Sequence, residues 1–151
     1  MKRDYPDRPL LGVGAVIVRQ EKVLVVRRAT PPLKGDWSIP GGLVEAGETT
    51  REAVVREISE ETGLTIEPIE LIEVFERILR DRDSRVEYHF VVIDYLCRIV
   101  SGVSRPGSDV SEIRWARSDD LEDLRITPET RHVIQKGLDA ANRSSEFRTD
   151  S

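Results

Sequence analysis

The chain has 151 residues, a length that favours one domain with a core large enough to be stable alone. Its 23 lysines and arginines against 28 aspartates and glutamates give a formal net charge of −5, which excludes a generally basic surface for nucleic acid or an anionic membrane. The single cysteine, Cys97, excludes an intrachain disulfide and fits a reducing, cytoplasmic location.

The first predicted elements are two strands of a hairpin. Residues 10–18 (LLGVGAVIV) form an apolar run far shorter than the roughly 20 residues that cross a bilayer, so no membrane segment is expected. The run ends in RQEK rather than at a small-residue cleavage site, and we interpret it as a buried strand paired with residues 23–28 (VLVVRR). The loop ATPPLKGD then leads to a short strand at 37–39 (WSI) and a predicted turn at Pro40-Gly41-Gly42.

A helix is predicted at about residues 49–62. Thr49 and Glu52 match a capping box at its start, and Gly63 is placed to end it. The later elements, in chain order, are strands at 66–79, 86–99 and 112–116 and a last helix from Thr127-Pro128 to about residue 141. Cys97 lies in the apolar run FVVIDYLCRIV and is expected in the core.

This order of elements favours an α/β or α+β sandwich in which helices cover the faces of a mixed sheet. The chain contains no repeat and no low-complexity linker, so we expect a single domain over residues 1–142. The polar end of the chain, residues 143–151, is predicted to be a flexible tail.

Three carboxylates share one stripe of the predicted helix at 49–62. At 100° per residue, Glu57, Glu60 and Glu61 span an arc of about 100°. Like charges at this spacing destabilise a helix by a few tenths of a kcal/mol per pair, and a divalent cation would turn that repulsion into chelation. Since oxygen is the only donor type nearby, we expect Mg²⁺ first and Mn²⁺ second. On composition alone, a solvated glutamate-rich helix is the commoner explanation.

The spacing around this helix is more specific than its composition. The residues follow the pattern Gly42-x5-Glu48-x7-Arg56-Glu57-Ile58-x-Glu60-Glu61-x-Gly63-Leu64. This pattern resembles the Nudix box, the signature of the Nudix hydrolases, with every defining position filled. The preceding segment, Gly35 to Gly42 (GDWSIPGG), agrees with what often precedes the box in that family.

The resemblance implies an α/β/α sandwich with a mixed sheet and a metal-dependent hydrolase. In the family, Mg²⁺ or Mn²⁺ supports cleavage of a nucleoside diphosphate linked to another moiety. Carried over by position, the metal ligands would be Glu57, Glu60, Glu61 and the carbonyl of Gly41 or Gly42. Arg56 would orient a helix carboxylate, and Glu48 would hold the loop.

The resemblance leaves the general base open, because family members use either a box glutamate or an acidic residue on a later loop. On the later loop, Asp109 and Glu112 are our candidates, and a turn-forming role for Asp109 is equally compatible. Arg27 and Arg28 are candidate substrate contacts, but alternation along a strand points at most one of them at the site. Trp37 either stacks on a base or packs in the core.

We therefore expect a pyrophosphohydrolase acting on a small nucleotide, with ADP-ribose or a nucleotide sugar favoured and a nucleoside triphosphate next. One alternative is a non-catalytic nucleotide-sensing Nudix module, which often lacks box carboxylates. Another is a diphosphate-utilising isomerase, which needs a pocket cysteine that Cys97 does not supply. The arginine-rich hairpin tip at 80–85 is expected to be solvated; its reach to an anionic ligand or to the second subunit of a homodimer is the alternative.

Overall fold

The computed structural model describes residues 3–107 and 109–150. A seven-stranded mixed sheet, two α-helices and two 3-10 helices make up this part of the chain. The strands are β1 (Leu10–Arg19), β2 (Lys22–Arg28), β3 (Trp37–Ser38), β4 (Gly41–Leu43), β5 (Thr65–Arg80), β6 (Val86–Ser101) and β7 (Val110–Ala116). The helices are α1 (Thr50–Thr62), η1 (Ser118–Asp123), α2 (Pro128–Arg143) and η2 (Ser145–Asp150).

Strand β1 is the centre of the sheet. Its end pairs antiparallel with β2, which confirms the predicted hairpin, and most of its length pairs parallel with β6, from Leu10 opposite Phe90 to Ile17 opposite Cys97. The order of the main path is β3-β2-β1-β6-β5, with β4 added on β1 and β7 on β2. The sheet is therefore mixed, as the sequence predicts.

The predicted turn at Pro40-Gly41-Gly42 is wrong in part, because Gly41–Leu43 forms the short strand β4. This strand pairs antiparallel with β1, with Gly41 opposite Gly14 and Gly42 opposite Val13. A Cβ atom on Gly41 would overlap the carbonyl oxygen of Val13. The close approach of the two backbones therefore requires glycine at this position.

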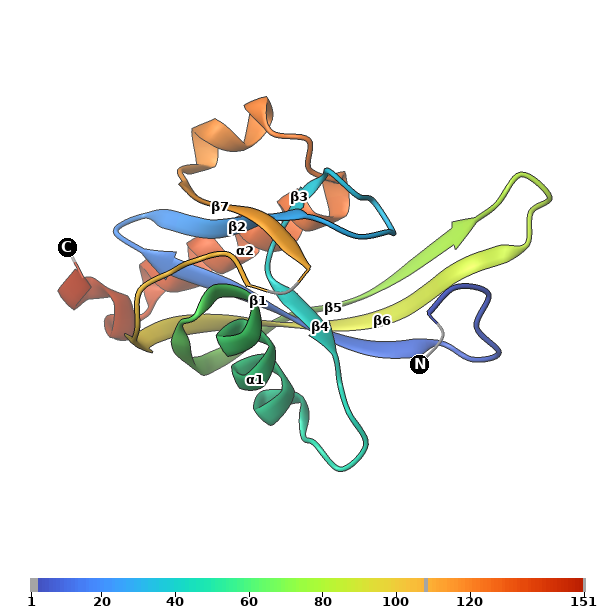
Figure 1. Cartoon of the computed structure of the whole chain (residues 1–151). Coiled ribbons are helices and arrows are strands. Elements are labelled where there is room, and N and C mark those ends of the chain that lie inside the picture. Colours follow the sequence, from blue (N-terminus) through green and yellow to red (C-terminus); the bar gives the residue numbers. More distant parts are fainter. Residues whose placement is uncertain (1–2, 108, 151) are drawn as a thin grey trace.

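The two long helices cover opposite faces of the sheet (Figure 1). Alternation along β1 sends Val16 into a core cluster beneath α2, where it meets Val133 and Ile134. The next residue, Ile17, enters a second cluster beneath α1, together with Ile58. Each helix buries one apolar face in this way, which confirms the predicted α/β/α sandwich. The helix α1 thereby fixes its polar edge relative to β4.

Strands β5 and β6 extend beyond the sandwich as a two-stranded arm (Figure 1). The N-terminal segment is bound to this arm, because the Tyr5 hydroxyl donates to Asp81 over 2.8 Å and the Tyr5 N–H donates to the Glu87 carbonyl over 2.7 Å. A homodimer formed through the tip of the arm stays a prediction.

The end of the chain carries more structure than its composition suggests. Helix α2 continues to Arg143, η2 follows, and Phe147 packs against the core cluster beneath α2. Flexibility of residues 143–151 stays a prediction, and residue 151 lies outside the described residues. Within the described ranges, no helix is long and apolar enough to cross a membrane.

Candidate active site

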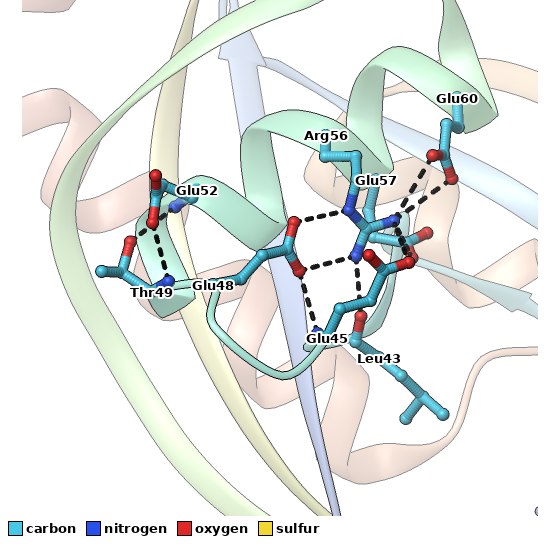
Figure 2. Close-up of polar contacts among 8 residues, drawn as sticks. All are labelled: Leu43, Glu45, Glu48, Thr49, Glu52, Arg56, Glu57 and Glu60. Carbon is cyan, nitrogen blue, oxygen red and sulfur yellow. Dashed lines mark hydrogen bonds and ion pairs between the residues drawn. The ribbon is translucent and has the colours of Figure 1, made fainter. Parts of the chain in front are cut away.

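Helix α1 is held at both ends by the predicted signals. The Thr49 hydroxyl accepts the Glu52 N–H over 3.1 Å, and the Glu52 carboxylate accepts the Thr49 N–H over 2.9 Å (Figure 2). Gly63 ends the helix with a φ of 77°, a left-handed conformation that favours glycine. The capping box and the terminal glycine thus fix where α1 begins and ends.

A cavity of about 320 Å³ opens beside α1 and extends over the face of the sheet that α2 covers. It brings together residues from α1, β4, the end of β2 and the start of β7. Eight of the sequence-predicted site residues line it: Arg28, Gly41, Gly42, Arg56, Glu57, Glu60, Glu61 and Asp109. Glu48, Arg27 and Trp37 are not among its lining residues.

Arg56 is the centre of a charged network on α1 (Figure 2). Its guanidinium makes a forked contact with Glu48, with donor–acceptor distances of 2.6 and 2.9 Å, and donates to Glu57 over 2.9 Å and to the Leu43 carbonyl over 3.0 Å. Glu60 accepts from the same guanidinium at 3.3 Å. One arginine therefore ties the loop before α1 to two of the three helix carboxylates.

The contacts of Glu48 are those of a permanently ionised carboxylate. The Arg56 guanidinium and the N–H of Glu45 both donate to it, and together they lower the pKa of Glu48 to about 2. Although Glu48 does not line the cavity, it fixes the guanidinium that contacts the residues that do.

Glu61 has the opposite environment. Its residue is only 8% exposed, and its carboxylate accepts the Gly41 N–H over 2.7 Å. Burial raises the pKa of Glu61 to about 8; the hydrogen bond from Gly41 opposes this rise, and the charge of Glu57 adds to it. Burial also raises the pKa of Glu57. The ionised forms of both carboxylates are thus disfavoured by burial, and the charge of Glu57 adds to this effect at Glu61, which is the electrostatic condition that a bound cation relieves.

The backbone at Gly42 leaves room for the carboxylate of Glu57, because a Cβ atom there would overlap it. All nearby donor atoms are oxygens, which suits Mg²⁺ or Mn²⁺. In the described part of the chain, no three His, Cys, Asp or Glu side chains are already gathered as a metal-binding group. The residues fit an ion held by one or two carboxylates and completed by a backbone carbonyl, water and substrate phosphate.

Comparison with known proteins agrees with this geometry. The family model of the NUDIX domain matches residues 8–137. The chain belongs to the Nudix family.

Several Nudix relatives are similar over most of their length. An ADP-ribose pyrophosphatase of Methanocaldococcus jannaschii is 36% identical over 121 residues, covering 80% of this chain and 69% of that protein. A putative 8-oxo-dGTP diphosphatase 2 of Mycobacterium tuberculosis is 35% identical over 126 residues, covering 81% and 83%. The crystal structure of a MutT NUDIX hydrolase from Burkholderia pseudomallei matches with a TM-score of 0.76 and 32% identity, covering 86% of this chain and 98% of that one.

The two arginines at the end of β2 point to opposite faces of the strand, as its alternation predicts. Arg28 lines the cavity and donates to the Pro32 carbonyl over 2.6 Å, and burial lowers its pKa while the charge of Glu61 raises it. Arg27 is exposed and faces Glu112 at 3.5 Å. Of these two arginines, Arg28 lines the cavity and Arg27 does not.

Trp37 packs in the core beneath α2, with the guanidinium of Arg114 over its ring at 4.9 Å. Its contacts favour the packing interpretation over base stacking.

Asp109 lines the cavity of this Nudix site and also forms a turn. Its φ is 60°, and its carbonyl accepts the Ala29 N–H over 3.0 Å. Its charge is near enough to Glu61 to raise the pKa of that residue. Both interpretations of Asp109 made from the sequence are thus compatible with its position, whereas the other candidate base, Glu112, pairs with Arg27 outside the cavity.

A second part of the cavity lining could not be predicted from the sequence. There the lining residues come mainly from β5, β6 and α2, and they include Phe75, Arg77, Phe90, Val92, Asp94 and Thr130. The one local signal was Asp94, an acidic residue inside the apolar run FVVIDYLCRIV. A charge inside a buried strand calls for a partner or a function.

Proposed function

We propose that this Nudix hydrolase cleaves the pyrophosphate bond of a nucleoside diphosphate linked to another moiety, in the presence of Mg²⁺ or Mn²⁺. The observation that carries the proposal is the pairing of buried Glu61 with Glu57 beside the glycine backbone of β4, at the end of a cavity large enough for a nucleotide. ADP-ribose is the favoured substrate, because the relative from Methanocaldococcus jannaschii is named an ADP-ribose pyrophosphatase.

In this proposal Glu57, Glu60 and Glu61 hold the cation with a carbonyl of Gly41 or Gly42. When bound, the ion supplies charge neutralisation at the phosphate oxygens and a lower pKa for a coordinated water. Arg56 keeps the carboxylates of α1 in position through its contacts with Glu57 and Glu60.

Two further residues act on the substrate itself in this proposal. Arg28, on the cavity wall, donates to a phosphate oxygen as negative charge develops there. Asp109 accepts the proton of the attacking water. The attack breaks one phosphoric anhydride bond, so that ADP-ribose yields AMP and ribose 5-phosphate.

The test is a screen of nucleotide diphosphates with the purified protein and Mg²⁺, in which products are identified by mass. We expect AMP and ribose 5-phosphate from ADP-ribose. A nucleoside monophosphate and pyrophosphate from a nucleoside triphosphate would support the second candidate substrate class, which the name of the Mycobacterium tuberculosis relative favours. Binding of nucleotide without any turnover would instead support a sensing module.

A further inference from the structure

Asp94 is a carboxylate without a partner on the floor of the cavity. It lies in β6, its residue is 0% exposed, and neither carboxylate oxygen has a hydrogen-bond partner among the described residues. Gly14 faces it from β1, and a Cβ atom on Gly14 would overlap the Asp94 Oδ1 atom. The glycine therefore leaves the space that the carboxylate occupies, and both residues line the cavity.

The guanidinium of Arg77, whose charge acts on Asp94, makes its hydrogen bonds to other residues. The Arg77 guanidinium donates to the hydroxyls of Thr127 and Thr130, over 3.3 and 3.4 Å, and lies over the Phe75 ring at 5.4 Å. Arg77 acts on Asp94 only through its charge, and burial still raises the pKa of Asp94 to about 7. Because a buried acceptor with no partner is costly, these oxygens are suited to donors that a ligand brings.

The surroundings of Asp94 are mostly apolar. Phe90 and Val92 share its face of β6, Phe75 contributes from β5, and Val133 contributes from α2. A flat heterocycle fits such walls and can place one or two N–H groups at the carboxylate. A ribose would leave several hydroxyls unpaired there, at a cost that a single carboxylate does not offset.

We propose that Asp94 is a specificity-determining residue, which accepts hydrogen bonds from the amino group or ring N–H of the substrate's nucleobase. This inference rests on the proposed function for the identity of the substrate class. An ionised carboxylate only accepts, so a base that presents an amino group pairs with it. A base with a carbonyl oxygen at the same place sets acceptor against acceptor and is disfavoured.

The experiment compares ligand pairs in which one amino group of the base is either removed or replaced by a carbonyl oxygen. Dissociation constants are measured by calorimetry for ADP-ribose against its hypoxanthine analogue and for GTP against ITP, at about pH 8.5, where Asp94 is ionised. Ca²⁺ replaces Mg²⁺ to slow turnover. We expect the wild type to bind the aminated member of at least one pair about tenfold or more tightly. In Asp94→Asn the ratio should fall to about twofold, because the amide has one acceptor oxygen and one donor NH₂ and can turn to pair with either an amino group or a carbonyl oxygen of the base.

A second variant and a control keep the test decisive. Gly14→Ala forces the Asp94 carboxylate to move without changing its charge, so it should reduce the same ratio if Asp94→Asn fails to fold. Glu76→Gln alters an exposed carboxylate on the neighbouring strand and should leave the ratio unchanged.

Three results would overturn the inference. These are equal binding of both members of each pair by the wild type, an equal loss for both members in Asp94→Asn, and a changed preference only for an ADP-ribose analogue that lacks a hydroxyl on its terminal ribose. The readout is binding, so discrimination without hydrolysis would refute the proposed function alone. Hydrolysis without discrimination would refute the role of Asp94 alone.

Discussion

At the scale of single residues, the site depends on how one guanidinium is shared. Arg56 contacts Glu48 through a fork and Glu57 and Glu60 through its remaining nitrogen. A lysine offers a single point charge and cannot reproduce the fork. We therefore expect Arg56→Lys to lower turnover at least tenfold and the free energy of unfolding by about 1–3 kcal/mol. Steady-state kinetics and thermal unfolding would measure both, and unchanged values would show that the network is not needed.

Asp109 has two compatible roles that kinetics can separate. If it is the general base, Asp109→Asn should reduce kcat by about 10²–10⁴-fold with little change in KM. The backbone turn, and with it the hydrogen bond from Ala29, should survive because asparagine also tolerates a positive φ. A variant with normal kcat would assign Asp109 to the turn.

Asp94 should give the protein a pH-dependent stability. Its pKa is raised from 3.8 to about 7 by burial, with the charge of Arg77 opposing and that of Glu73 adding to the shift. Because the folded form binds its proton more tightly than the unfolded form, stability contributed by protonated Asp94 is lost as the pH rises from about 4 to 7. The free-energy difference between Asp94→Asn and wild type should therefore shift in favour of the variant, by up to about 4 kcal/mol, across this range. Denaturant titrations at several pH values measure it, and a constant difference would contradict the assignment.

The sequence predicted the charged end of the cavity and missed the other end, for a physical reason. Glu57, Glu60 and Glu61 are close because one helix repeats every 3.6 residues, and that spacing is visible in the letters. Arg28 and Arg27 separate by strand alternation, which is equally local. The surroundings of Asp94 come from Gly14 and from α2, which lie far away along the chain, and no local pattern reports such neighbours.

At the scale of elements, the capping box of α1 stabilises a helix that repulsion between its glutamates destabilises. Thr49→Ala removes the hydroxyl that accepts the Glu52 N–H, and we expect it to lower the free energy of unfolding by about 1 kcal/mol. Since Thr49 is not a lining residue of the cavity, turnover below the unfolding transition should stay close to that of the wild type. Unfolding and kinetic measurements on one sample test this, and a large loss of turnover in a folded variant would show that the cap also positions the carboxylates.

Strand β4 is an element that its own residues do not predict. Pro40-Gly41-Gly42 has the composition of a turn, and its glycines do allow an unusual backbone approach. Their use is tertiary, because Gly41 lies directly against β1 and Gly42 leaves room for Glu57. The identity of the residues was thus informative, but the partner strand could not be read from them.

At the scale of the whole molecule, element order led to the correct architecture. Strands, helix, strands and helix indicate a covered mixed sheet, and the amphipathic helices indicate which faces are buried. The order of the strands in the sheet could not be predicted from the order of the elements, because the pairing of β1 with β6 joins residues that are distant in sequence. The cavity arises at this level, because its lining residues come from α1, from α2 and from strands of the sheet between them.

The central claim is that the carboxylates of α1 hold a catalytic cation. The most direct measurement is the rate of ADP-ribose hydrolysis by wild type and Glu61→Gln, after removal of divalent cations and then with Mg²⁺ restored. Glu70→Gln, at an exposed position, is the matched control. We expect Mg²⁺ to restore activity to the wild type and the control, and Glu61→Gln to stay folded at least 100-fold slower. Near-normal turnover by Glu61→Gln, or full activity without a divalent cation, would contradict the claim.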